Sequence, residues 1–268
     1  MLTRAITGAI FVAALIAGIY FNEIIALCLF SLIVLLGTDE FYTLVKKSKT
    51  INPIRFWGLL NSLTTIIILG LIILQTIELK FIVIPLIMIF STFIFELYRK
   101  KNHPFINIAY TVLPILYIAT PFAMLYHLGF YNSTNYSFQV ILGFFFLLWT
   151  SDTGAYLSGR FFGKHKLFER ISPKKTWEGS IGGTLLTIAI AYVLSIYFTN
   201  ITLTNWIIVG VLTAVFGGLG DLAESMLKRS LSIKDSGNIL PGHGGILDRF
   251  DGLLIGVPFV YTYLQLVQ

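Results

Sequence analysis

The sequence has little charge. Only 12% of its 268 residues are Asp, Glu, Lys or Arg, whereas a soluble globular domain carries about 25%. Apolar residues make up 56% of the chain, and the mean hydropathy is +0.82. So few charges cannot coat a protein of this length, which excludes a soluble enzyme of one or two domains. The apolar excess extends along the whole chain, so a single anchor or a removable signal peptide is excluded as its cause.

Other features are missing as well. The single cysteine, Cys28, excludes an intrachain disulfide. The sequence has no Cys–His cluster typical of zinc, no Gly-x-Ser-x-Gly element of a hydrolase and no P-loop of an ATPase. The chemistry must therefore come from other residue types.

Long apolar runs take up most of the chain. A membrane-spanning helix needs about 20 mostly apolar residues. The expected spans are 5–21, 24–45, 56–75, 80–97, 106–127, 137–157, 180–198, 205–227 and 250–267. Gly37, which Asp39 and Glu40 follow, is a candidate break in the second span. The predicted fold class is an all-α polytopic membrane protein with about nine transmembrane helices.

The basic residues fall on one side of these spans. With a cytoplasmic N-terminus, 18 of the 19 Lys and Arg lie in cytoplasmic segments, and only Lys80 lies elsewhere. This asymmetry is what the positive-inside rule predicts, and it places the C-terminus on the far side of the membrane. The formal net charge of +6 is thus explained by topology and anionic lipid headgroups, and we expect no nucleic-acid partner.

Two cytoplasmic loops contain more than topology requires. The loops near 158–179 and 228–249 mix basic residues with Gly, Ser, Thr, His and acids. We therefore expect residues 1–135 to form a lipid-facing scaffold of transmembrane helices. Residues 136–268 are expected to carry the catalytic site on helices and cytoplasmic loops.

The eighth span contains acids. One helical face carries Asp221, Glu224, Ser225 and Lys228 at positions i, i+3, i+4 and i+7. Carboxylates in a membrane helix are costly and normally face a partner or a wet cavity. The alternative is an internal ion pair between one of these acids and Lys228. The preceding Gly217-Gly218-Leu219-Gly220 permits close approach by another helix or a ligand.

The next segment combines glycines with acids. Repeated Gly around His243 gives exposed backbone N–H groups suited to phosphate oxygens, and His243 is a candidate site residue. Asp248 and Asp251 stand at i and i+3 of a helix that begins there. Their hard oxygen ligands suit Mg²⁺, which is usually bound by one or two carboxylates plus substrate phosphates.

The loop after the sixth span supplies cations. Ser172 or Thr176 is the expected cap of the seventh helix, whose N-terminus attracts anions close to Lys174 and Lys175. This arrangement suits a nucleoside triphosphate, and a solvated basic loop is the alternative. Asp152, near the cytoplasmic end of the sixth span, is a further candidate. Carboxylates for Mg²⁺ and cations for a polyphosphate are what phosphoryl or nucleotidyl transfer requires.

The C-terminal half resembles a known family. The matching residues are Ser225-Met226-Leu227-Lys228-Arg229, Lys234-Asp235 and Leu240-Pro241-Gly242-His243-Gly244-Gly245-Ile246-Leu247-Asp248-Arg249-Phe250-Asp251. They resemble, with their spacing, the signature of the phosphatidate cytidylyltransferases (CDP-diacylglycerol synthases). The segments from Asp152 to Gly163 and from Ser172 to Gly179 are similar to that family too, and Arg4 and Glu40 resemble its weaker N-terminal features.

The resemblance implies an integral-membrane nucleotidyltransferase of phospholipid biosynthesis. It would make CDP-diacylglycerol and pyrophosphate from CTP and phosphatidate with Mg²⁺ as cofactor, and the number of cations, one or two, stays open. The implied metal ligands are Asp221 and Asp248 first, then Asp251 and Glu224. Further catalytic groups are Asp152, Lys228 and Arg229. The implied substrate-binding residues are Ser172, Lys174, Lys175, Thr176, Ser225, Lys234, His243 and Arg249. A homodimer in a bacterial cytoplasmic membrane, with its active site facing the cytoplasm, fits the same resemblance.

Three other functions are weighed against this one. A CDP-alcohol phosphatidyltransferase shares the D-x-x-D-G element at Asp248, but the chain has no acid after Asp251 where that family needs two. A CTP-dependent polyprenol kinase would also bind CTP and a lipid, and the complete signature argues against it. An ion-coupled transporter is a different class, which midplane acids and inverted repeats would support. Here the acids lie at one face of the membrane and not at its midplane, and no internal repeat is evident.

Overall fold

The computed structural model describes residues 2–48, 50–231, 233, 237 and 244–268. They form two compact units. The first contains Met1–His127 and Leu231–Arg249, and the second contains Leu128–Ser230 and Phe250–Gln268.

The first unit is built from helices. They are α1 (Leu2–Phe21), α2 (Glu23–Val45), α3 (Arg55–Ile73), η1 (Leu79–Ile82), α4 (Val83–Arg99), α5 (Pro104–Pro114), η2 (Ile115–Ala119) and α6 (Thr120–His127). The last three run on without interruption, and η2 is a π-helical turn. It follows Pro114, which lacks an N–H group and so perturbs the regular hydrogen-bond ladder.

A buried polar network ties this unit together at the start of α3. Glu96 of α4 is 3% exposed, and its carboxylate accepts hydrogen bonds from Asn107 Nδ2 and Arg99 Nη1, both at 2.7 Å. Arg99 also donates to the backbone oxygen of Asn52. Asn107 Oδ1 accepts from the Asn52 backbone N–H at 2.8 Å. The connection between α2 and α3 is therefore anchored by buried side chains of α4 and α5, as buried polar groups require.

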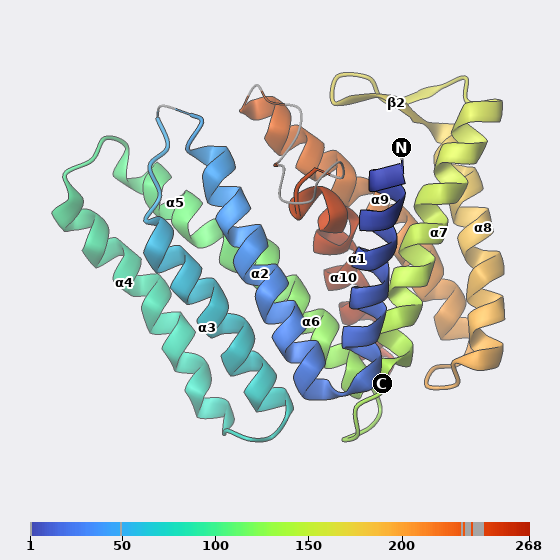
Figure 1. Cartoon of the computed structure of the whole chain (residues 1–268), viewed down its shortest axis with the longest axis horizontal. Coiled ribbons are helices and arrows are strands. Elements are labelled where there is room, and N and C mark those ends of the chain that lie inside the picture. The colour runs from blue at the N-terminus through green and yellow to red at the C-terminus, as the bar shows by residue number, and fades with distance from the viewer. Residues whose placement is uncertain (1, 49, 232, 234–236, 238–243) are drawn as a thin grey trace. The chain divides into compact units, whose positions relative to one another are not determined.

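The second unit holds the remaining elements. These are η3 (Leu128–Phe130), α7 (Phe138–Phe162), β1 (Lys166–Phe168), β2 (Ser172–Thr176), α8 (Trp177–Tyr197), α9 (Leu203–Ser230) and α10 (Leu247–Leu266), whose first turn lies in the first unit. Figure 1 shows α7 and α8 side by side, with the antiparallel β1–β2 hairpin beyond the ends that it connects. Small residues allow this close packing: a Cβ atom on Gly154 would lie 3.0 Å from the Cα atom of Gly183.

Glycines also bring α9 and α10 into contact. A Cβ atom on Gly220 would lie 2.5 Å from the backbone oxygen of Asp251 and 3.0 Å from the Cα atom of Gly252. The predicted close approach at Gly217-Gly218-Leu219-Gly220 is therefore made by another helix. It brings Asp251 of α10 beside the acidic stretch of α9.

The helices confirm the predicted class, an all-α polytopic membrane protein. Each expected span coincides with helical structure. Seven helices in the described part of the chain are long and apolar enough to cross a membrane, and the apolar part of α1, Ile6–Phe21, is shorter. The expected break at Gly37 is wrong, because α2 is continuous. Gly37 is buried against Ile118 and Leu247, so its small size serves packing.

Candidate functional site

Four carboxylates gather in the second unit. Asp152 comes from α7, Asp221 and Glu224 from α9, and Asp251 from α10. The Asp251 carboxylate interacts electrostatically with the other three, and Asp152 also interacts with Asp221. We call these four residues the acidic cluster. Three helices that are separate in sequence thus place their acids within mutual electrostatic range.

Lys175 of β2 enters this cluster. Its Nζ atom lies 2.8 Å from Oδ2 of Asp221 and donates to the backbone oxygen of Gly218, also at 2.8 Å. Ser225 Oγ lies 3.3 Å from the other carboxylate oxygen of Asp221. Both oxygens of Asp221 are therefore engaged by the protein. The predicted role of Lys175 in binding the triphosphate stays a prediction.

Glu224 is the most buried member of the acidic cluster. It is 1% exposed, and its carboxylate forms an ion pair with Lys228 one turn further along α9. The internal ion pair considered from the sequence therefore exists for Glu224, whereas Asp221 pairs across the fold with Lys175. Removal of one partner from a buried pair leaves an uncompensated charge and is strongly destabilising. The pair therefore contributes to the stability of α9, and the expected roles of Glu224 as a metal ligand and Lys228 as a catalytic group stay predictions.

The acidic cluster contains more carboxylates than lysines. Lys175 pairs with Asp221, and Lys228 pairs with Glu224. The described residues contain no group of three or more His, Cys, Asp or Glu side chains close enough together to hold a metal ion. The donor set nevertheless fits Mg²⁺, since proteins commonly hold it by one or two carboxylates and leave the other positions to water and phosphate.

The β1–β2 hairpin determines the position of Lys175. Thr176 caps α8, and its hydroxyl oxygen accepts from the Gly179 N–H at 3.2 Å. The Glu178 carboxylate accepts from the backbone N–H groups of Lys164 and His165, and it contacts His165 Nδ1 at 2.6 Å. The hairpin is thus closed at its base by the first turn of α8. Thr176 was one of the two predicted caps; Ser172 lies instead in β2, paired with Phe168.

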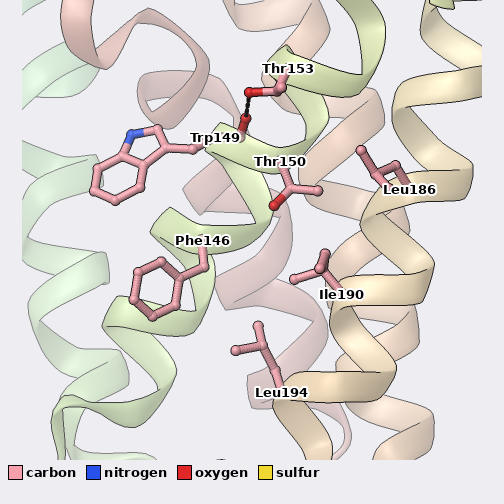
Figure 2. A pocket seen from close by; sticks show the side chains of 7 residues that line it. All are labelled: Phe146, Trp149, Thr150, Thr153, Leu186, Ile190 and Leu194. Atoms are coloured by element: carbon pink, nitrogen blue, oxygen red, sulfur yellow. Dashed lines mark hydrogen bonds between the residues drawn. The ribbon is translucent and has the colours of Figure 1, made fainter. Parts of the chain in front are cut away.

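An apolar groove lies between α7 and α8. It has a volume of about 460 Å³. Its lining residues are Phe146, Trp149, Thr150, Thr153, Leu186, Ile190 and Leu194. Figure 2 shows Thr153 at one end of this set and Leu194 at the other. The lining is apolar apart from Thr150 and Thr153.

Asp248 is described within the first unit. Its Oδ2 atom accepts from the Gly245 N–H at 3.0 Å, and the adjacent Gly244 has a φ of 83°. The N–H groups of Ile246 and Leu247 donate to the carboxylate of Glu40 on α2, at 2.7 and 3.2 Å. The predicted helix start near Asp248 is confirmed, because α10 begins at Leu247.

Five other predicted site residues fall into two groups, those exposed at the surface and those outside the described residues. Lys174 and Arg229 are exposed, and so is Arg249, whose backbone N–H donates to Ile246. Lys234 and His243 lie outside the described residues. Their proposed roles therefore stay predictions.

Three contributing residues were not expected from sequence alone. Glu178 and His165 close the hairpin that carries Lys175, and the only local signal was an acid in the first turn of α8. Glu40 had been noted as a family feature without a role. Its partners lie 206 and 207 residues further along the chain, a separation that no local pattern reveals.

Comparison with known proteins identifies the family of this chain. A model of the cytidylyltransferase family matches residues 2–267. The chain is 38% identical over 192 residues to a phosphatidate cytidylyltransferase of Staphylococcus aureus, covering 71% of this chain and 70% of the relative. It is 36% identical over 230 residues to one of Staphylococcus epidermidis, covering 82% and 85%. The chain belongs to the cytidylyltransferase family.

Proposed function

We propose that this protein is a phosphatidate cytidylyltransferase, which converts CTP and phosphatidate into CDP-diacylglycerol and pyrophosphate. The observation that carries the proposal is the acidic cluster with its two lysines, in a membrane protein of the cytidylyltransferase family. A triphosphate needs cations, a bridging metal needs carboxylates, and a lipid substrate needs a membrane-embedded enzyme.

The reaction is an in-line displacement at phosphorus. An oxygen of the phosphatidate phosphate attacks the α-phosphorus of CTP, and the bond from that phosphorus to the bridging oxygen of the β-phosphate breaks. The electron pair leaves with pyrophosphate. Because the attacking phosphate is already anionic near neutral pH, the protein needs no strong general base. Its task is to position two anions and to offset their charge.

Lys175 is well suited to this task. In the absence of substrate its ammonium group neutralises Asp221. A triphosphate bound beside the hairpin would offer the same ammonium group a second anionic partner. Lys174 and Arg229, both exposed, would add positive charge at the entrance. Glu224 and Lys228 would keep α9 in place beneath this region.

Mg²⁺ is the expected cofactor, and Asp221 and Asp251 of the acidic cluster would hold it. It would supply neutralisation of phosphate charge and help the pyrophosphate depart. The number of carboxylates in the cluster, four against the two lysines paired with them, supports this assignment. Asp248 of the first unit is the further ligand that the family resemblance implies. Lys175 would then pass from Asp221 to the substrate when the metal and the triphosphate are both present.

The groove between α7 and α8 is a suitable place for one acyl chain of phosphatidate. Its aliphatic lining would contact the chain. Thr153 of the lining and Asp152 of the acidic cluster are consecutive residues of α7, so one lipid molecule would place its headgroup at the cluster and a chain in the groove. Because the chain already lies in the bilayer, van der Waals packing would hold it in the groove.

The topology that fits this chemistry has nine spans. It would add α1 and α10 to the seven described helices that are long and apolar enough to cross a membrane. A cytoplasmic N-terminus puts the β1–β2 hairpin and the acidic cluster at the cytoplasmic face, where CTP is available. The bacterial origin of the similar proteins supports a location in the cytoplasmic membrane.

A direct test uses the purified protein in detergent micelles. Release of pyrophosphate from CTP should require both phosphatidate and Mg²⁺, and Asp221→Ala should reduce it by orders of magnitude while the protein stays folded. Pyrophosphate release that is independent of phosphatidate would count against the proposal. Formation of CDP in place of pyrophosphate would favour a lipid kinase instead.

A further inference from the structure

A buried carboxylate of α2 holds the first turn of α10. Glu40 is 3% exposed, and its two oxygens accept the backbone N–H groups of Ile246 and Leu247 at 2.7 and 3.2 Å. Gly237 also lies against it, because a Cβ atom there would be 3.1 Å from Glu40 Oε2. Both ends of this arrangement belong to the first unit.

Burial of the Glu40 carboxylate away from water costs free energy. A carboxylate removed from water needs hydrogen bonds to remain charged. The first N–H groups of a helix lack partners within the helix, and the positive end of the helix dipole attracts a negative charge. Glu40 and the start of α10 therefore satisfy each other. A side chain from the helix's own sequence usually does this, whereas here the acid comes from another helix.

The same turn carries Asp248. Its carboxylate accepts the Gly245 N–H at 3.0 Å, and a Cβ atom on Gly244 would lie 2.7 Å from Asp248 Oδ2. Gly244 has a φ of 83°, a conformation that glycine adopts without strain. Glu40 thus accepts hydrogen bonds from the two N–H groups that precede Asp248 in the chain. Asp248 itself accepts one from the next N–H group upstream, that of Gly245. The orientation of the Asp248 side chain depends on both contacts.

We infer that Glu40 is a positioning residue, which holds the start of α10 so that the Asp248 carboxylate keeps the orientation needed in the reaction. The part of this inference that concerns turnover rests on the proposed function. The part that concerns the backbone does not, and it can be measured separately.

The test compares Glu40→Gln with Asp39→Asn. Both replace an acid of α2 by its amide, but Asp39 pairs with Arg55 at 2.6 Å and is 39% exposed. Glutamine keeps one acceptor oxygen and presents an NH₂ group to the other N–H, so one hydrogen bond to a charged group is lost. Hydrogen–deuterium exchange of the peptide covering 244–250 should rise by about tenfold in Glu40→Gln. It should change by less than about threefold in Asp39→Asn.

Turnover provides the second measurement. Glu40→Gln should lower kcat by roughly tenfold to a hundredfold, as expected when a reacting group is displaced by about 1 Å. The KM for CTP should stay nearly constant. In an Asp248→Asn background the additional loss from Glu40→Gln should disappear, because Glu40 acts through Asp248. A merely structural role would lower the thermal stability without this dependence on Asp248.

The outcomes separate the two claims. Unchanged exchange in Glu40→Gln would overturn the inference whatever the protein catalyses. Faster exchange with unchanged kcat would overturn the positioning role while leaving the proposed function intact. An inactive wild-type protein would contradict the proposed function and with it the role in turnover, and the exchange measurement would then report only on the helix start.

Discussion

Lys175 Nζ lies 2.8 Å from Asp221 Oδ2, which joins the β1–β2 hairpin to α9 through two residues of the candidate site. The same ammonium group donates to the backbone oxygen of Gly218, one turn earlier on α9. Lys174, its neighbour in sequence, is exposed. Two adjacent lysines with equal charge therefore stand in different surroundings.

This difference predicts unequal effects of substitution. Lys175→Ala should lower kcat/KM for CTP by about a hundredfold, because a charge aimed at the reacting phosphates is lost and Asp221 is left unneutralised. Lys174→Ala should lower it by less than about fivefold, and added salt should reduce that effect, because the group is exposed. Steady-state rates at two salt concentrations measure both. Equal losses in the two variants would contradict the assignment of Lys175 to the site.

The glycines of α9 predict a pair of opposite stability changes. Gly220→Ala should destabilise the protein by about 1–3 kcal/mol, because its Cβ atom would meet the backbone of Asp251 and Gly252. Gly218→Ala should be neutral or stabilising by up to about 1 kcal/mol, since nothing lies within 4 Å of a Cβ atom there. Thermal unfolding in detergent measures the difference. A Gly220→Ala variant as stable as the wild-type protein would contradict the close packing of α9 against α10.

The groove between α7 and α8 predicts a specific effect on the lipid substrate. Ile190→Trp fills part of the groove and should raise the KM for long-chain phosphatidate several-fold, because van der Waals contacts with the acyl chain are lost. The KM for CTP should not change. Val193→Trp is the control, because Val193 is an exposed residue of α8 outside the lining. Similar kinetics of the two variants with short- and long-chain lipids would exclude the groove as an acyl-chain site.

The four carboxylates of the acidic cluster predict a dependence on divalent cations. Chelation should abolish activity, and Mg²⁺ should restore it. Asp251→Asn should raise the Mg²⁺ concentration for half-maximal rate by about tenfold or more, because one oxygen ligand loses its charge. Asp39→Asn, outside the cluster, should leave that concentration unchanged. An unaltered Mg²⁺ dependence in Asp251→Asn would remove this residue from the metal site.

The sequence predicted the helices well because the membrane requires long apolar runs, and each expected span coincides with helical structure. It also predicted that Asp221, Glu224, Ser225 and Lys228 share a face, because helical spacing is a local property. It did not predict which of these acids pairs with which lysine. The Lys175–Asp221 pair and the contact of Glu40 with α10 join residues far apart in the chain. The β1–β2 hairpin was missed because its strands are short, and one contains Pro173.

The fate of the phosphates of CTP tests the central claim most directly. Purified protein with phosphatidate and Mg²⁺ should transfer radioactive label from the α-phosphate of CTP into the lipid fraction, and label from the γ-phosphate should appear only in pyrophosphate. The Lys175→Ala variant should show the same pattern at a much lower rate. Label from the γ-phosphate in the lipid fraction, or none from the α-phosphate, would contradict the proposed cytidylyl transfer.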